Sequence, residues 1–281
     1  MNSAATGDVD VVDQAALSAA LSRSTLVELG RTLYNGMPSS PNHPGFKMAL
    51  MRRHGDAVRA DGSSAANEII VTGGHVGTHV DALAHVSYEG CLHGGVDAAR
   101  AQTGGRFSSL GADEVPPMLG RGLFFDIATA RDTDVLPGGY GVTADDLSSI
   151  LDTAGIEPRA GDVAVVRTGW GRYWDDPERY AGHASGVPGV SLDAAEWLVA
   201  HGFRAVGTDT TACEQLAPGA GHSLLPVHKV LLVDAGIHIL EHLALEDLAA
   251  TGIVEFSFVM APLRIVGATG SPIRPLAVVV G

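Results

Sequence analysis

The sequence predicts an α/β fold, in which one domain is built around a mixed β-sheet. Helix signals and short apolar or β-branched runs alternate through the second half of the chain, which is typical of strands covered by helices. The 281 residues could form one large domain or two small ones, and 46% of them are hydrophobic, so a sizeable core can be buried. No internal repeat, low-complexity tract or linker divides the chain. One domain is therefore the simplest architecture.

The first half contains few regular elements. Residues 1–10 are expected to form a loose start and residues 11–21 a short helix, because alanine and leucine recur on one helical face. Residues 1–24 would then be an N-terminal extension that carries this helix, and residues 25–281 the domain itself. Strands are predicted at residues 24–29 and at the β-branched run 67–72.

The second half is richer in helix and strand signals. Thr143, with Asp146 three residues later, resembles a capping box, so a helix is expected to begin there and to end before Gly155. Ser191 precedes a second predicted helix that ends at Gly202. The remaining predicted elements are strands at residues 163–166, 204–206, 230–233, 237–240 and 253–260, and a helix at residues 245–252.

The composition argues against several functional classes. The formal net charge is −14, from 32 acidic and 18 basic residues, and a surface this acidic repels nucleic-acid phosphates and anionic lipids. No apolar run approaches the roughly 18–20 residues that span a bilayer, and the first 25 residues lack a signal-peptide pattern. Two cysteines, Cys91 and Cys213, are too few for a disulfide framework. We therefore expect a cytoplasmic protein whose partner is a small-molecule substrate, with no nucleic acid and no membrane.

The most informative segment gathers metal-binding side chains. His75, His79, Asp81 and His85 place three imidazoles and a carboxylate within eleven residues. These donors suit zinc, manganese or iron, whose nitrogen and oxygen ligands lie about 2.0–2.2 Å from the ion. Chance clustering among 12 histidines is the alternative, but four donors around a glycine make a metal site the better interpretation.

The spacing constrains the shape of this segment. On a helix, His75 and His79 would share a face while Asp81 and His85 point away from it. On a strand, the four side chains would share a face, but His75 and His79 would be about 13 Å apart. A bend at Gly77 would let them converge. The segment is therefore predicted to be a strand-to-loop corner.

The pattern H-x-G-T-H-x-D-x-x-x-H resembles the signature of the cyclase family, which includes bacterial kynurenine formamidase and isatin hydrolase. Coverage runs from about residue 25 to the C-terminus. Leu83 stands where kynurenine formamidases usually have proline, so the resemblance leans toward isatin-hydrolase-like members. Further matching segments are Gly36-Met37-Pro38, Gly161-Asp162-Val163, Arg167-Thr168-Gly169-Trp170, Gly207-Thr208-Asp209 with Glu214, Pro226-Val227-His228, Gly236-Ile237 with Glu241, and Thr269-Gly270-Ser271-Pro272.

The resemblance implies a fold, an assembly and a set of roles. The fold would be of the swivelling β/β/α type, in a homodimer or a dimer-based tetramer with the active site near subunit contacts. His75, His79 and Asp81 would bind the catalytic metal. His85, His228 and Glu241 would hold a second metal in dinuclear members, and in mononuclear members His85 and His228 would be acid/base groups over the substrate. These three residues are our catalytic candidates, and zinc or manganese is the expected cofactor.

Other residues permit two interpretations each. Trp170 could line a substrate pocket or pack in the core, and Glu214 could contact the substrate or be solvated; both are candidates for substrate binding. The run from His238 to His242 fits H-x-x-E-H, an inverted zinc-peptidase motif. That motif requires a helix, whereas this stretch alternates as a strand does, so we expect His238 and His242 to be packing or surface residues.

We hypothesise metal-assisted hydrolysis of a small amide-type C–N bond, in an aryl formamide, a lactam or a cyclic imide. His85 would accept the proton of the attacking water and pass it to the departing nitrogen. A lactone-hydrolysing or polyketide-type cyclase on the same fold is one alternative. A catalytically inactive metal-binding protein is another.

Overall fold

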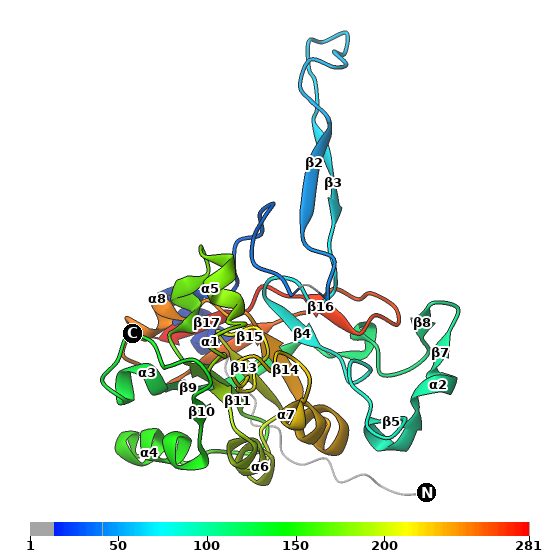
Figure 1. Cartoon of the computed structure of the whole chain (residues 1–281). Coiled ribbons are helices and arrows are strands. Elements are labelled where there is room, and N and C mark those ends of the chain that lie inside the picture. Colours follow the sequence, from blue (N-terminus) through cyan, green and yellow to red (C-terminus); the bar gives the residue numbers. More distant parts are fainter. Residues whose placement is uncertain (1–13, 41, 281) are drawn as a thin grey trace, which may run out of the picture.

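The computed structural model describes residues 14–40 and 42–280, so the predicted loose start lies outside the described residues. A nine-stranded mixed sheet forms the centre of this part of the chain (Figure 1). In spatial order its strands are β1 (Ser24–Glu28), β17 (Leu276–Val280), β15 (Glu255–Met260), β9 (Met118–Asp126), β11 (Val163–Arg167), β13 (Ala205–Thr208), β14 (His238–Glu241), β4 (His79–Asp81) and β16 (Gly270–Pro272).

The sheet is parallel in the middle and antiparallel at both sides. β9, β11, β13 and β14 run parallel, while β15 and β17 on one side and β4 and β16 on the other pair in the antiparallel sense. The first and last described strands, β1 and β17, pair with each other. The predicted α/β fold, one domain built around a mixed sheet, is confirmed.

Helices and short helical turns surround the sheet. The helices are α1 (Gln14–Arg23), α2 (Ala98–Ala101), α3 (Ile127–Ala130), α4 (Ala144–Ala154), α5 (Pro177–Ala181), α6 (Leu192–Ala200), α7 (Pro226–His228) and α8 (Glu246–Ala249). Single 3₁₀ turns occur at His93–Gly95, Ala112–Glu114 and Trp170–Tyr173, and a π-helical segment at Lys229–Ala235 continues α7. No helix within residues 14–40 and 42–280 is long and apolar enough to cross a membrane.

Core side chains cover both faces of the sheet. On one face, Val166 of β11 packs in a cluster with Leu147 of α4 and Leu198 of α6. On the other face, Val165 packs in a cluster with Leu248 of α8. Because β11 is buried on both faces, its sequence is a continuous apolar run rather than an alternating one.

Most predicted elements are found, with small shifts at their ends. Helix α4 has the predicted capping box, in which the Thr143 and Asp146 side chains bond each other's backbone N–H, and Gly155 ends it in a left-handed conformation. The described part of the predicted N-terminal helix is α1, and its side chains are not buried. It therefore lies at the periphery of the fold.

One predicted element was wrong, and one central strand was missed. Residues 230–233 belong to the π-helical segment after α7, not to a strand. A short apolar run does not distinguish a buried strand from a buried helix, and Pro226 at the first position of α7 is the helix signal. The central strand β9 was not predicted, because Gly120 and Gly122 interrupt its apolar pattern.

A long hairpin projects from the rest of the molecule (Figure 1). It consists of β2 (Lys47–Arg52) and β3 (Asn67–Val71), which pair in the antiparallel sense, and all of their residues are exposed. The strand predicted at residues 67–72 is thus confirmed, but it lies outside the main sheet. Three further short pairs are β5 (Cys91–Leu92) with β6 (Val96–Asp97), β7 (Gln102–Thr103) with β8 (Arg106–Phe107), and β10 (Gly141–Val142) with β12 (Gly189–Val190).

Candidate metal centre

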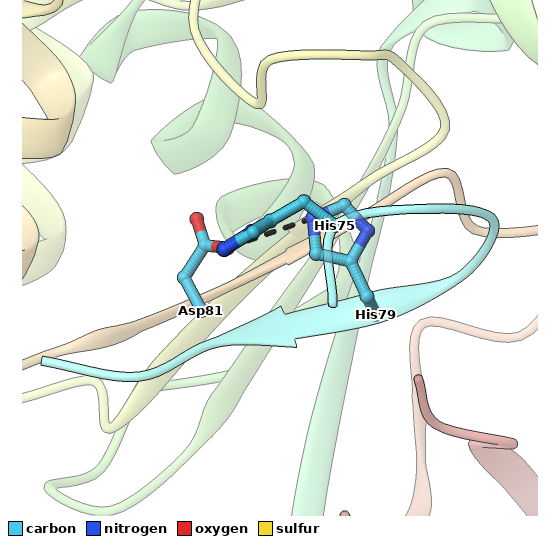
Figure 2. Close-up of side chains that lie close together, drawn as sticks. All are labelled: His75, His79 and Asp81. Atoms are coloured by element: carbon cyan, nitrogen blue, oxygen red, sulfur yellow. Dashed lines mark ion pairs between the residues drawn. The ribbon is translucent and has the colours of Figure 1, made fainter. Parts of the chain in front are cut away.

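The predicted bend in the histidine segment is present at Gly77. Gly77 has a φ of 66°, a left-handed value that glycine adopts readily. It turns the chain between His75 and strand β4, whose residues His79 and Asp81 are two apart and therefore face the same side. The turn brings His75 back over that side (Figure 2).

Hydrogen bonds orient the two imidazoles toward Asp81. His75 Nε2 lies 2.9 Å from Thr269 Oγ1, and His79 Nδ1 lies 2.8 Å from the Gly77 carbonyl oxygen. The other ring nitrogens face inward: His75 Nδ1 is 2.7 Å and His79 Nε2 is 3.5 Å from Asp81 Oδ1 (Figure 2). Each ring is thus fixed by its outer nitrogen, which is the usual arrangement for a metal-binding histidine.

Two residues distant in sequence complete the cluster. Strand pairing sets His79 opposite Glu241 of β14, and Glu241 Oε2 is 3.4 Å from His79 Nε2. The second oxygen, Oε1, is 3.5 Å from His228 Nε2, which in turn is 3.8 Å from Asp81 Oδ2. Asp81 and Glu241 each lie between two or more imidazoles, so both carboxylates could be shared by two ions.

Glu214 holds His228 in place. Its Oε1 accepts a hydrogen bond from the backbone N–H of His228 at 3.0 Å and lies 2.6 Å from His228 Nδ1. Both residues are buried. The carboxylate therefore caps the start of α7 and leaves His228 Nε2 facing the cluster.

The donor atoms fit a metal cation. His75 Nδ1, His79 Nε2 and both carboxylate oxygens of Asp81 are buried without a hydrogen-bond partner of acceptable geometry. A buried polar atom left unsatisfied costs about 1–3 kcal/mol, and more when it is charged. Within the described ranges, three sets of donors lie close enough together to hold an ion: His75, His79 and Asp81; Asp81, His85 and His228; and His79, Glu241 and His242.

The pKa values show how charge is balanced when no ion is bound. Burial opposes a charge on His79, but contacts with Asp81 and Glu241 raise its pKa to about 10. Burial opposes a charge on His228 as well, and Glu214 and Glu241 raise its pKa to about 10. Burial favours protonated Glu241, but His228 and His79 lower its pKa to about 2. The two protonated imidazoles thus supply the positive charge that a bound cation would supply.

The cluster opens into a cavity of about 280 Å³. Six of the residues that line it are His43, His75, His85, His228, Glu241 and His242. The His85 ring stacks on that of His75, with centroids 3.9 Å apart. Burial lowers the pKa of His85 to about 4, so its imidazole is neutral at ordinary pH.

The candidate site residues differ in how they relate to this cavity. His75, His79, Asp81, His85, His228 and Glu241 come together as one cluster. Trp170 lies in the neighbouring core, where its indole N–H donates to the Tyr180 carbonyl oxygen, and it is not among the residues that line the cavity. Glu214 contacts His228 rather than the cavity.

Sequence reasoning missed His242. We expected it to be a packing or surface residue, and it is indeed buried, but it also lines the cavity. The signal that could have found it is its position directly after Glu241 in H-x-x-E-H. β14 is a strand, so the peptidase interpretation of that motif, which requires a helix, is wrong.

Together these features define the class of protein. A sheet edge that gathers buried, unpaired imidazole and carboxylate atoms beside a cavity is the arrangement of a metal-dependent enzyme. Residues 27–215 match the model of the family described as Putative cyclase. The chain belongs to this family.

The chain resembles known proteins over most of its length and most of theirs. The chain is 27% identical to kynurenine formamidase of Sphingopyxis alaskensis, over 90% of this chain and 97% of that protein. It is 29% identical to isatin hydrolase of Roseibium aggregatum, over 78% and 77% of the two chains. A crystal structure described as a novel cyclase superposes with a TM-score of 0.83 at 28% identity, covering 94% of this chain and 89% of that one.

Proposed function

We propose that this protein is a metal-dependent hydrolase that cleaves an amide-type C–N bond in a small molecule, such as an aryl formamide, a lactam or a cyclic imide. The observation that carries the proposal is the convergence of buried donor atoms without partners on one cavity. The two curated relatives, named kynurenine formamidase and isatin hydrolase, support the C–N bond as the target.

His75, His79 and Asp81 are the proposed ligands of a divalent transition metal, zinc or manganese, because imidazole and carboxylate donors accommodate both. His228 and Glu241 provide donors for a second ion that would share Asp81. An ion held here supplies Lewis-acid activation of water and of the substrate carbonyl group.

His85 is the proposed proton carrier. It lines the cavity, is neutral, and lies beside the ligand His75. It accepts a proton from the attacking water and returns it to the departing nitrogen, which leaves poorly unless it is protonated. We assign Glu214 to positioning His228 rather than to binding substrate, because its contacts are with the His228 ring and backbone. Trp170 packs in a core cluster with Trp174 and Tyr180, so we assign it a packing role.

A panel of small substrates tests the proposal. Metal-loaded protein would be offered aryl formamides, isatin and simple lactones, and the products identified. We expect hydrolysis of at least one amide-type substrate, and a loss of about 10²–10⁴-fold in kcat for His85→Ala with metal content unchanged. Full activity of His85→Ala would overturn the proposed role of His85. Turnover of lactones alone would show that the enzyme cleaves an ester bond rather than a C–N bond.

We also propose that the protein is a homodimer or a dimer-based tetramer in the cytoplasm. The projecting β2–β3 hairpin supports self-association, because an isolated two-stranded hairpin is marginally stable in water and this one exposes Leu50, Met51, Ile69 and Ile70. A second copy is the favoured partner, since the hairpin segment 47–71 is slightly basic in a chain whose net charge is −14. Two free thiols, Cys91 and Cys213, are compatible with a reducing compartment.

A further inference from the structure

His242 occupies a constrained position beside the candidate metal centre. It follows Glu241 directly and has a φ of 57°, in the left-handed region that non-glycine residues seldom adopt. Its backbone is fixed on both sides: its N–H donates to the Thr210 carbonyl oxygen at 3.0 Å, and its carbonyl oxygen accepts from Thr78 Oγ1 at 2.7 Å. Such strain, when held by surrounding bonds, is common at functional sites.

The environment of the His242 ring determines which nitrogen carries its proton. Tyr180 Oη is 2.8 Å from His242 Nδ1 and 3.1 Å from the Asp209 carbonyl oxygen. The carbonyl can only accept, so we assign the single phenol proton to Asp209, and the phenol oxygen then accepts from Nδ1–H. His242 is therefore the Nδ1–H tautomer, and its Nε2 carries a free lone pair.

Nε2 is the ring nitrogen that Tyr180 leaves free, and one ring nitrogen of His242 lies within 4.8 Å of donor atoms of His79 and Glu241. His242 is 3% exposed and lines the cavity, while its Nδ1 edge is turned toward Tyr180. Nε2 has no hydrogen bond among the described residues, yet it is not one of the buried atoms left without a partner. It is therefore the part of the ring that a ligand in the cavity can reach.

We propose that His242 Nε2 accepts a hydrogen bond from the N–H of the scissile amide, and so makes the site selective for secondary amides and N–H lactams over esters, tertiary amides and N-alkylated lactams. This inference rests on the proposed hydrolase function. A lone pair facing the ester oxygen of a lactone finds no donor and is repelled. A site built to bond a substrate N–H therefore rejects analogues that lack it.

The test compares three matched substrates: a lactam, its N-methyl derivative and the lactone of the same ring. Four proteins are assayed for kcat/KM, metal content and folding: wild type, His242→Phe, Tyr180→Phe and the control His201→Phe. His201 is an exposed histidine whose ring is tilted against that of Trp197. We expect the ratio of lactam to each analogue to fall about 10-fold or more in His242→Phe, with metal content unchanged, and to stay at its wild-type value in His201→Phe.

A second readout does not depend on turnover. ¹⁵N NMR of the metal-free and zinc-loaded protein should show His242 as the Nδ1–H tautomer, and Tyr180→Phe should increase the Nε2–H form. An unchanged substrate ratio in His242→Phe, an Nε2–H tautomer in wild type, or the loss of a metal ion in His242→Phe would each overturn the inference. The last outcome would make His242 a metal ligand instead. If wild type hydrolyses no amide at all, the proposed function itself fails.

Discussion

The carboxylates of Asp81 and Glu241 each contact two or more imidazoles, and these contacts determine the protonation of the site without metal. His79 contacts both carboxylates, and His228 contacts both as well. A proton on each imidazole compensates the buried negative charge. In the metal-free protein, the protonated His79 and His228 stabilise the fold. This stabilisation is complete below the ordinary histidine pKa of 6.5 and is lost as pH rises through their raised pKa of about 10.

Metal binding should therefore release protons. Because the pKa of His79 and that of His228 are about 10 in the metal-free site, a ligand nitrogen is protonated at pH 8 and must lose its proton to bind an ion. We expect the affinity for zinc to rise roughly tenfold per pH unit between pH 7 and 9 for each proton displaced. Calorimetry in buffers of different ionisation enthalpy measures the number released, and a value of zero would contradict the charge balance described above.

Glu214 should act on metal affinity through His228. In Glu214→Gln the amide can still accept from the backbone N–H, but the charged contact with His228 Nδ1 is lost. Changes in such supporting groups weaken metal binding about 10–100-fold. Competition with a chelator measures the effect, and the exposed Glu196→Gln serves as the control. An equal loss in both variants would show that the effect is not specific to His228.

At the scale of elements, short strands rather than helices build the site. β4 is only three residues long, yet its pairing with β14 brings Glu241 opposite His79, and its pairing with β16 brings Gly270 opposite Asp81. Thr269, next to Gly270, is within hydrogen-bond distance of His75. The site therefore depends on the register at this edge of the sheet.

Gly270→Ala should disturb the metal centre without straining the backbone. A Cβ at Gly270 would lie 2.6 Å from His75 Cε1, too close for the ring to keep its place. Gly120→Ala in β9 is the matched control, because a Cβ there meets nothing within 4 Å. We expect metal affinity to fall at least about tenfold in Gly270→Ala, with a destabilisation of roughly 1–3 kcal/mol in thermal unfolding. Equal metal binding by the two variants would show that His75 can move without consequence.

The sequence predicted the local part of the site better than the long-range part. The bend at Gly77 followed from the spacing of His75, His79 and Asp81, since no regular element lets them meet. The partners of β4 could not be predicted in this way, because strand order depends on contacts across the whole chain. Only the family resemblance indicated Glu241 and His228, and the hydrogen bond that orients His242 required the structure.

Helices and strands were likewise predicted where a local sequence signal was clear and missed where it was not. The helix at Thr143 was predicted correctly because its capping box is a local signal. The strand expected at residues 230–233 is helical, and β9 was missed despite its central place in the sheet. In the first case an apolar run did not distinguish strand from helix, and in the second Gly120 and Gly122 interrupted the strand pattern.

At the scale of the whole molecule, the contacts within a single chain do not explain how the β2–β3 hairpin is stabilised. It stands away from the body of the protein (Figure 1), and apolar side chains are exposed on its strands. Two-stranded hairpins of this kind normally require a further surface to cover them. In the proposed assembly, that surface belongs to a second copy of the chain.

Charged substitutions on the hairpin should therefore separate the copies. The double variant Leu50→Lys with Ile70→Lys is expected to shift the mass measured by light scattering toward that of a monomer, because lysine in an apolar interface must be desolvated. Leu119→Lys, at a leucine of β9 that is even more exposed than Leu50, should leave the mass unchanged. A monomeric wild type at micromolar concentration would contradict the proposed assembly.

The most direct test of the central claim is metal content per chain, measured on untagged protein after zinc or manganese has been offered. Wild type would be compared with His79→Ala and with the control His201→Ala. The account predicts one or two ions per chain in wild type and in the control, and loss of metal in His79→Ala. A wild type that remains metal-free would contradict the assignment of this cluster as the metal centre, and with it the hydrolase function.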